Sequence, residues 1–332
     1  MSKWVKDHQK ILIILFFPYL FVLLLLIAPT KFSLTAPGGL TPVYENIEIE
    51  SVDIKKNFYT IYVVSYYPMT PFQKMISDVS ERISVREMTE RDEDTSWRDV
   101  YLQGQLTKEV SLHTSIIKAY ELAHLRNPEI MIDYEYLGAS VYYRPSRISE
   151  LEIGDLVISV NNQSLTSMTY QMFYDYFYQQ TSVTLEIARH EENEIKYFTI
   201  DYVKQMDEPW MLFYPKYDVI SSYPTFDFTQ NNPLIGGPSG GMIQTLSIYA
   251  SLLNINLGDL KIAGTGTIEI DGSIGRIGGI LQKLYTAIDA EADIFIYPKG
   301  HISDIPDMEY PYEMIAVGTI EEAVTWLHEK VE

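Results

Sequence analysis

The sequence contains no cysteine among its 332 residues. Disulfide bonds and zinc sites built from thiolates are therefore excluded. This absence fits a protein that works outside the cytoplasm without disulfides, but it fits many cytosolic proteins equally well. It does not fix the compartment.

Several nucleotide and metal signatures are missing too. No Gly-x-x-x-x-Gly-Lys-Ser/Thr segment occurs, so no P-loop ATPase is expected in this sequence, and no Gly-x-Gly-x-x-Gly occurs. The six histidines are scattered without His-Glu-x-x-His spacing, which favours surface or packing roles over a metal site. We therefore expect no cofactor and no metal ion.

Positive charge is scarce. The chain has 25 lysines and arginines against 45 acidic residues, a net charge of −20. Without a basic patch to offset this charge, nucleic acid is not expected as a partner. The acidic balance also repels anionic lipid headgroups, so we expect the folded part to stand off a bilayer.

One long hydrophobic run occupies residues 11–28. At about 1.5 Å per residue, such a helix can span a bilayer core of about 30 Å. The three lysines of residues 1–10 predict a cytoplasmic tail, so we expect a single-pass cell-membrane protein with extracellular C-terminal domains. A cleaved signal peptide is the alternative, although its apolar region would be shorter. The proline and glycine of residues 29–42 predict a juxtamembrane linker.

Residues 236–241 read Gly-Gly-Pro-Ser-Gly-Gly, with Ser239 in the fourth position. The glycines allow the backbone to approach a bound carbonyl group closely. Apolar residues then recur at helical spacing, so we expect Ser239 at or just before a helix N-terminus. Unpaired N–H groups and the helix dipole favour a developing negative charge there, as an oxyanion site requires.

Lys283 lies in a second helical pattern, over about residues 280–292. The residues three and four positions away on that helix carry no acid: Gly279, Ile280, Thr286 and Ala287. A lysine on a mostly apolar face loses hydration, which lowers its pKa from about 10.4 toward about 7–8, where the amine can accept a proton. A serine beside such an amine would be an activated nucleophile.

Each feature alone has an ordinary reading. Gly-Pro-Ser-Gly is usually a turn, and most lysines on helices are solvated. A Ser-His-Asp site would need a histidine that the sequence does not single out.

In combination, these motifs resemble the proteolytic domain of the Lon-type Ser-Lys peptidases. The family carries Gly-Pro-Ser-Ala/Gly-Gly at the nucleophile and Gly-Gly-x-x-x-Lys at the base. Here the second motif occupies residues 278–283, and Gly-Thr-Gly at 264–266 matches the family's Thr-Gly. The resemblance covers about residues 226–298. Many members carry an acidic residue before Gly-Pro-Ser, where this chain has glycine.

The resemblance implies roles for four residues. Ser239 would attack the peptide carbonyl, Lys283 would be the general base and Thr265 would orient the lysine. Backbone N–H groups of Ser239 and Gly237 would hold the oxyanion. The Ala-Pro-Gly-Gly of residues 36–39 and the Gly-Gly-Pro-Ser also resemble the membrane-anchored branch of the family in bacteria, in which a PDZ domain accompanies the Lon domain.

Residues 126–205 have the order of a PDZ domain. Residues 151–162 resemble the pattern Leu-x-x-Gly-Asp-x-Ile-x-x-Val-Asn/Asp-Gly, with Asn162 at the final glycine, and asparagine tolerates the same left-handed turn. The predicted carboxylate-binding loop consists of Leu137, Gly138 and Ala139. Such a loop would hold the C-terminus of a peptide added to a sheet edge. Alternatively, the module packs against the peptidase and binds nothing.

The fold class predicted is α/β (α+β). Six segments are expected: a tail (1–10), an anchor (11–28), a linker (29–42), a mixed region (43–125), a PDZ-like domain (126–205) and a Lon-type proteolytic domain (206–332). The mixed region carries no catalytic constellation, but it includes a predicted strand at 59–66, a charged surface segment at 81–98 and an amphipathic helix at 106–124.

The function predicted is that of a membrane-anchored, ATP-independent serine endopeptidase acting outside the cytoplasm. Without an ATPase it would cleave peptides or flexible, unstructured protein segments. The alternative is an inert peptide-binding scaffold at the membrane. Lon relatives commonly form rings, which leaves a homo-oligomer open.

Overall fold

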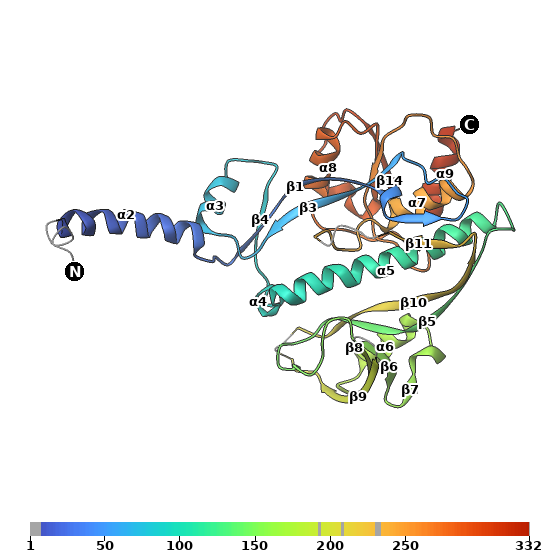
Figure 1. Cartoon of the computed structure of the whole chain (residues 1–332), viewed down its shortest axis with the longest axis horizontal. Helices are drawn as coiled ribbons and strands as arrows, with labels where there is room; N and C mark the ends of the chain where they lie inside the picture. Colours follow the sequence, from blue (N-terminus) through green and yellow to red (C-terminus); the bar gives the residue numbers. More distant parts are fainter. Residues whose placement is uncertain (1–7, 192–193, 207–208, 230–233, 332) are drawn as a thin grey trace.

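The computed structural model describes residues 8–191, 194–206, 209–229 and 234–331. A helix projects from the N-terminal end of a body that contains two large β-sheets (Figure 1). A long helix, α5 (Trp97–His124), lies between the two sheets. The described chain mixes helices and strands in the way an α/β class requires.

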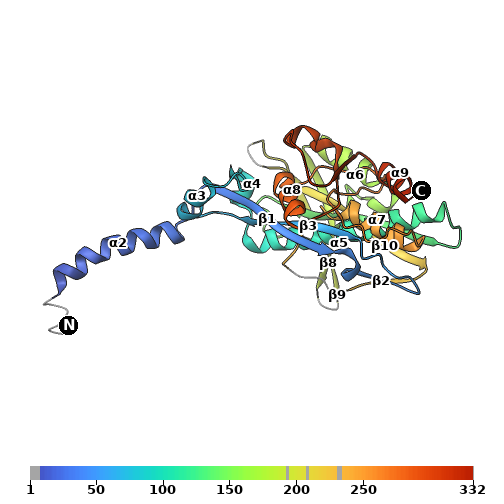
Figure 2. The ribbon, with the colours of Figure 1, turned by 90° about the horizontal axis from the view of Figure 1, so that it is seen from above.

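Helix α2 (Gln9–Ile27) extends away from the body in both views (Figures 1 and 2). It is long and apolar enough to cross a membrane, and none of its apolar window is buried. The helix coincides with the predicted anchor at 11–28. Residues 1–7 of the predicted tail lie outside the described residues.

The first sheet has the strand order β14-β13-β12-β3-β1-β4. Its strands are β1 (Phe32–Pro42), β3 (Phe58–Tyr66), β4 (Ser84–Glu87), β12 (Ile262–Gly264), β13 (Ile294–Pro298) and β14 (Glu313–Val317). Neighbours from β14 to β3 run parallel, whereas β1 is antiparallel to both β3 and β4. The crossover from β12 to β13 is supplied by the helix α8 (Ile280–Asp289), and the one from β13 to β14 contains a short 3-10 helix (Lys299–Asp304).

Strand β1 corrects the prediction of a linker at residues 29–42. The prolines and glycines that suggested a linker are accommodated by a β-bulge, where the register with β3 shifts between Pro37 and Gly39. At Gly38 an added Cβ would lie 2.2 Å from the carbonyl oxygen of Tyr62, so only glycine allows this approach. The segment therefore forms part of the sheet.

Helices cover both faces of the first sheet. They are α7 (Gly241–Leu252) and α9 (Ile320–Val331) on one face and α8 (Ile280–Asp289) on the other. The residues of β13 alternate between these layers, because successive side chains of a strand point to opposite faces. Ile294 and Ile296 join the core with α7, whereas Phe295 and Tyr297 join the core with α8.

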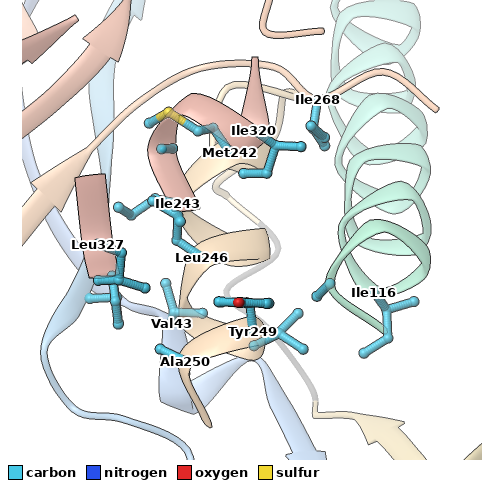
Figure 3. Packing of buried hydrophobic residues seen from close by; sticks show 14 of the residues in the cluster. Val43, Ile116, Met242, Ile243, Leu246, Tyr249, Ala250, Ile268, Ile320 and Leu327 are labelled. Atoms are coloured by element: carbon cyan, nitrogen blue, oxygen red, sulfur yellow. The ribbon is translucent and has the colours of Figure 1, made fainter. Parts of the chain in front are cut away.

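The core around α7 is the larger of the two. Figure 3 shows Met242, Leu246 and Tyr249 of this helix directed toward residues from other elements. Ile320 of α9 and Ile116 of α5 belong to the same buried cluster. Burial of such side chains contributes about 1.5–3 kcal/mol each, so α7 is held from several sides.

The second sheet has the order β10-β5-β6-β8-β9, with β7 paired to β6. Its strands are β5 (Met131–Tyr143), β6 (Leu156–Val160), β7 (Gln163–Ser164), β8 (Ser182–Glu191), β9 (Glu194–Val203) and β10 (Leu212–Tyr223). Helix α6 (Tyr170–Gln179) buries Phe173 and Phe177 against it. We call this sheet and α6 the second unit.

Two predictions for the second unit need correction. The boundary expected at 205/206 divides the sheet, because β10 pairs with β5 along most of its length. The predicted loop of Leu137, Gly138 and Ala139 is part of strand β5. At Ala139 this strand is paired on both sides, with β10 and with β6, so it presents no free edge to a peptide there. The left-handed turn at Asn162 is confirmed, with φ of 65°.

The predicted mixed region at 43–125 does not form a separate part. Strand β3 lies within the first sheet, and α5 begins nine residues before the expected start at 106 because Ser96 caps it by accepting from the N–H of Asp99. The predicted surface segment at 81–98 contains β4 and the short helix α4 (Glu90–Asp94). The remaining elements are α3 (Pro71–Ser77) and the paired strands β2 (Ile47–Ile49) and β11 (Phe226–Phe228).

Candidate active site

Ser239 lies on the loop that enters α7, two residues before the first residue of that helix. The side chain is half-buried, while α7 itself is almost entirely buried. Gly266 donates its N–H to the carbonyl of Ser239 at 2.8 Å, and Met242 donates to the carbonyl of Gly266 at 3.1 Å. These bonds tie the serine to the segment that follows β12.

Lys283 lies in the first turn of α8 and is 2% exposed. Gly279 is the N-cap residue before this helix; it has φ of 69°, and its carbonyl accepts the N–H of Lys283 at 3.0 Å. The left-handed backbone at this position favours glycine, and an added Cβ would crowd Val63 and Thr35 at 3.1 and 3.3 Å. Gly279 therefore sets the direction in which α8 starts, and this direction carries Lys283 inward.

The structure brings Ser239, Lys283 and Thr265 together. The Nζ atom of Lys283 lies 2.7 Å from Oγ of Ser239 and 2.8 Å from Oγ1 of Thr265. Thr265, which is fully buried, also donates to the carbonyl of Ser239 at 3.1 Å. Thr265 thus fixes the amine and the serine backbone at once.

Burial lowers the pKa of Lys283 from 10.5 to about 7. The cause is desolvation, because the charged ammonium loses its hydration among buried neighbours. An amine with this pKa is about half neutral at pH 7 and can accept the proton of a hydroxyl at hydrogen-bond distance. The site holds a serine and a proton acceptor in contact.

Helix α5 anchors the serine loop at three points. Gly237 donates its N–H to the carbonyl of Gly104 at 2.8 Å, and Ser111 donates to the carbonyl of Pro238 at 3.1 Å. Ser115 donates to the carbonyl of Gly241 at 2.9 Å. The sequence-based prediction of no catalytic role in this region missed these contacts, although Gly104, Ser111 and Ser115 recur on one helix face as small residues.

The contact with α5 also corrects the role predicted for Gly237. Its N–H is already donated to Gly104, so it cannot point to an oxyanion in this conformation. Among the described residues, the N–H groups of Ser239 and Gly240 donate no hydrogen bond, and they lie at the N-terminus of α7. These two groups are the better donors, because the helix dipole there favours negative charge.

A cleft of about 1040 Å³ opens over Ser239 and Lys283. Its walls come from β1, β3, the first turns of α5, the loop before α8 and the serine loop. This volume is at the upper end of small-molecule pockets and can hold several residues of an extended peptide. The predicted PDZ loop residues 137–139 do not line it.

A buried histidine holds the loop before α8. His301 accepts the N–H of Ile277 through Nε2 at 2.9 Å, and its Nδ1 lies 2.7 Å from Asp304. Arg276 donates to the same carboxylate at 2.6 Å. His301 was predicted as a surface or packing residue, whereas it lines the cleft and positions the loop that leads to Gly279 and Lys283.

Comparison with known proteins adds an independent observation. The chain is 38% identical to a mitochondrial Lon protease homolog of Emericella nidulans over 93 residues, which are 28% of this chain and 8% of that protein. It is 31% identical to the Lon protease of Methanosarcina barkeri over 112 residues, 30% of this chain and 14% of the relative. Part of this chain is therefore similar to Lon proteases.

The matches cover only part of this chain and only part of each relative. A mitochondrial Lon protease homolog of Neurospora crassa is 28% identical over 145 residues, which cover 44% of this chain and 12% of the relative. The chain therefore spans only a small part of these Lon proteases, between 8 and 14% of their length. No protein-family model matches the chain. The matches support the Lon family and do not extend to a membrane-anchored branch.

Proposed function

We propose that this chain is a serine endopeptidase in which Ser239 and Lys283 form a catalytic dyad. The observation that carries the proposal is the 2.7 Å contact between the serine hydroxyl and a buried amine whose pKa is lowered to about 7. The partial similarity to Lon proteases supports a protease of this family. The cleft supplies room for a peptide beside these two residues.

In the first half of the reaction, neutral Lys283 accepts the proton of Ser239 as its Oγ attacks the peptide carbonyl carbon. The N–H groups of Ser239 and Gly240 would hold the carbonyl oxygen as it becomes negative. The C–N bond then breaks, and Lys283 returns the proton to the leaving amine. The product is an ester between the substrate's acyl group and Ser239.

In the second half, water attacks this ester. Lys283 accepts a proton from the water, and the proton passes to Ser239 as the C–O bond breaks and the carboxylic acid leaves. Thr265 holds the amine in place through both halves, because its hydroxyl lies 2.8 Å from Nζ on the side away from the open cleft. A single base serves both halves of the reaction, because the proton transfers of the second half reverse those of the first.

We also propose that α2 anchors the chain in a membrane with the body outside the cytoplasm. Its length, its apolar composition and the fact that none of its apolar window is buried support an anchor. Since the sequence has no P-loop, the substrates would be peptides or flexible segments that need no unfolding. In this proposal the second unit is a PDZ-like module whose ligand edge is not at residues 137–139.

The test is cleavage of a mixed peptide library by the full chain, analysed by mass spectrometry. Ser239→Ala and Lys283→Ala should each lose cleavage, while the exposed Lys56→Ala should retain it. Cleavage that survives in both site variants would overturn the dyad. Absence of cleavage in the unmodified chain, together with peptide binding, would favour the scaffold.

A further inference from the structure

Helix α3 exposes an apolar face. The helix starts from a capping box in which Thr70 accepts the N–H of Gln73 and Gln73 accepts the N–H of Thr70, with proline following Thr70. Four large apolar side chains of this segment are exposed: Phe72 (42%), Met75 (61%), Ile76 (51%) and Val79 (87%). We call these four residues the apolar tip. The spacing of the first three places them on one face of α3, and Val79 lies just beyond the end of that helix.

The apolar tip lies beside the end of α2. Helices α2 and α3 contact one another, and both views show α3 next to that end of α2 (Figures 1 and 2). Thr30 donates its N–H to Met69 at 3.0 Å, and Met69 donates to Phe32 at 2.8 Å. Because Met69 is fully buried and directly precedes the capping box, the position of the tip relative to α2 is fixed.

Both acidic and basic side chains lie near the tip: the exposed Asp78 stands between Ile76 and Val79, and two lysines lie close by. Lys74 lies on α3 with its Nζ 3.3 Å from the ring centre of Phe32, and Lys31 follows the end of α2. Long basic side chains keep their charge at headgroup level while their stems lie along apolar surface. The expectation that the folded part stands off a bilayer, drawn from the net charge of −20, therefore need not hold for this end.

We infer that the apolar tip inserts into the membrane surface from which α2 emerges. This inference depends on the proposed membrane anchor. An exposed apolar patch that continues the surface of a membrane-spanning helix meets lipid at the depth where that helix leaves the bilayer. Two attachments, α2 and the tip, would hold the body in one orientation, whereas α2 alone would let it pivot.

The fixed orientation has a consequence for substrates. The active-site cleft shares Tyr67 and Trp97 with a second cavity of about 250 Å³, which Thr30 and Lys31 also line. The two aromatic rings stack with centroids 5.2 Å apart. One end of the cleft therefore adjoins residues 30 and 31, which follow the C-terminal end of α2. When the apolar tip is inserted in the membrane, this end of the cleft faces the membrane surface. Chain segments that emerge next to the bilayer would enter there.

The absence of cysteine allows a direct test with single labelled positions in the full chain. Met75→Cys and Val79→Cys report on the tip and Leu23→Cys reports on α2. Leu125→Cys, 77% exposed in the unaltered chain and beyond the far end of α5, is the matched control. Each variant carries an environment-sensitive fluorophore and is reconstituted in vesicles of phosphatidylcholine and phosphatidylglycerol, with and without a nitroxide-labelled lipid.

We expect blue-shifted emission and quenching by the nitroxide lipid at positions 23, 75 and 79, with neither change at 125. If position 23 is quenched while positions 75 and 79 behave like position 125, the inference that the tip inserts in the membrane is refuted and the proposed anchor stands. No quenching at 23 would overturn the anchor and the tip together. A blue shift at 75 and 79 without quenching would mean that protein, such as a second copy, covers the tip, and would also overturn the inference.

Discussion

Replacement of Lys283 by methionine should stabilise the protein at neutral pH. Methionine has a similar length and no charge, so it fills the same buried space without a group that requires hydration. Burial lowers the pKa of this amine from 10.5 to about 7. Since one pH unit of pKa corresponds to about 1.36 kcal/mol, burial of the ammonium costs on the order of 5 kcal/mol at low pH.

The sign follows from proton linkage. Between pH 7 and 10.5 the unfolded chain keeps the lysine proton while the folded chain has lost it, so the stability of the unaltered protein rises with pH across this window. The variant gains stability because no ammonium has to be buried, but it loses the hydrogen bonds to Ser239 and Thr265. This loss lowers the gain in unfolding free energy by about 2 kcal/mol. We therefore expect Lys283→Met to be about 2–3 kcal/mol more stable at pH 7, and this advantage to vanish toward pH 10.

Urea denaturation of the full chain in detergent micelles measures this difference. Trp326 on α9 packs against the core around α7, so in a background where the other three tryptophans are replaced by phenylalanine its emission reports on the unit that contains the site. Lys56→Met is the control for replacing an exposed lysine. A variant that is less stable at pH 7, or one whose gain is equal at pH 7 and pH 10, would show that the amine is not desolvated.

Three further outcomes test the site. If cleavage uses Lys283 as base, kcat/KM should rise with pH through a midpoint near 7, because the amine must lose its proton; a profile flat from pH 6 to 8 contradicts this. Thr265→Val should lower kcat by about 5–30-fold through loss of its hydrogen bond to Nζ, while Thr265→Ser keeps the hydroxyl and most of the rate. Gly236→Ala should cost about 1–3 kcal/mol of stability, because its Cβ would lie 2.8 Å from the backbone of Gly104. Gly104→Ala meets only an ordinary contact at 3.5 Å and should stabilise α5 by up to about 1 kcal/mol; equal thermal denaturation of these two variants would contradict the packing described.

Local patterns predicted the elements near the site well. The strand predicted at 59–66 and the helix predicted at about 280–292 lie within one and three residues of the observed bounds of β3 and α8, because their apolar patterns are regular. The pairing of Ser239 with Lys283 was predicted from motif order and spacing, which the resemblance supplied. Motif order and spacing do not show which residues surround Thr265 and bury it, since burial depends on the whole fold.

Two of the errors share one physical cause. Residues 29–42 and 137–139 contain glycine, which suggests turns, yet here glycine lets a neighbouring chain approach. At Gly138 an added Cβ would lie 2.2 Å from the carbonyl of Val157, a partner on another strand. The bond from Ser111 to Pro238 spans 127 residues. Such contacts depend on tertiary pairing, which a local reading of composition does not contain.

Helix α5 explains how the two sheets act on one site. Gly104, Ser111 and Ser115 hold the serine loop, whereas Leu106 and Val110 pack with Ile153 and with Tyr214 of β10 in the second unit. At 100° per residue these two sets lie on opposite sides of the helix. A displacement of the second unit would therefore move α5 against the loop that carries Ser239. If the second unit binds peptide, this helix is the physical route by which binding would change the position of the N–H groups at Ser239 and Gly240.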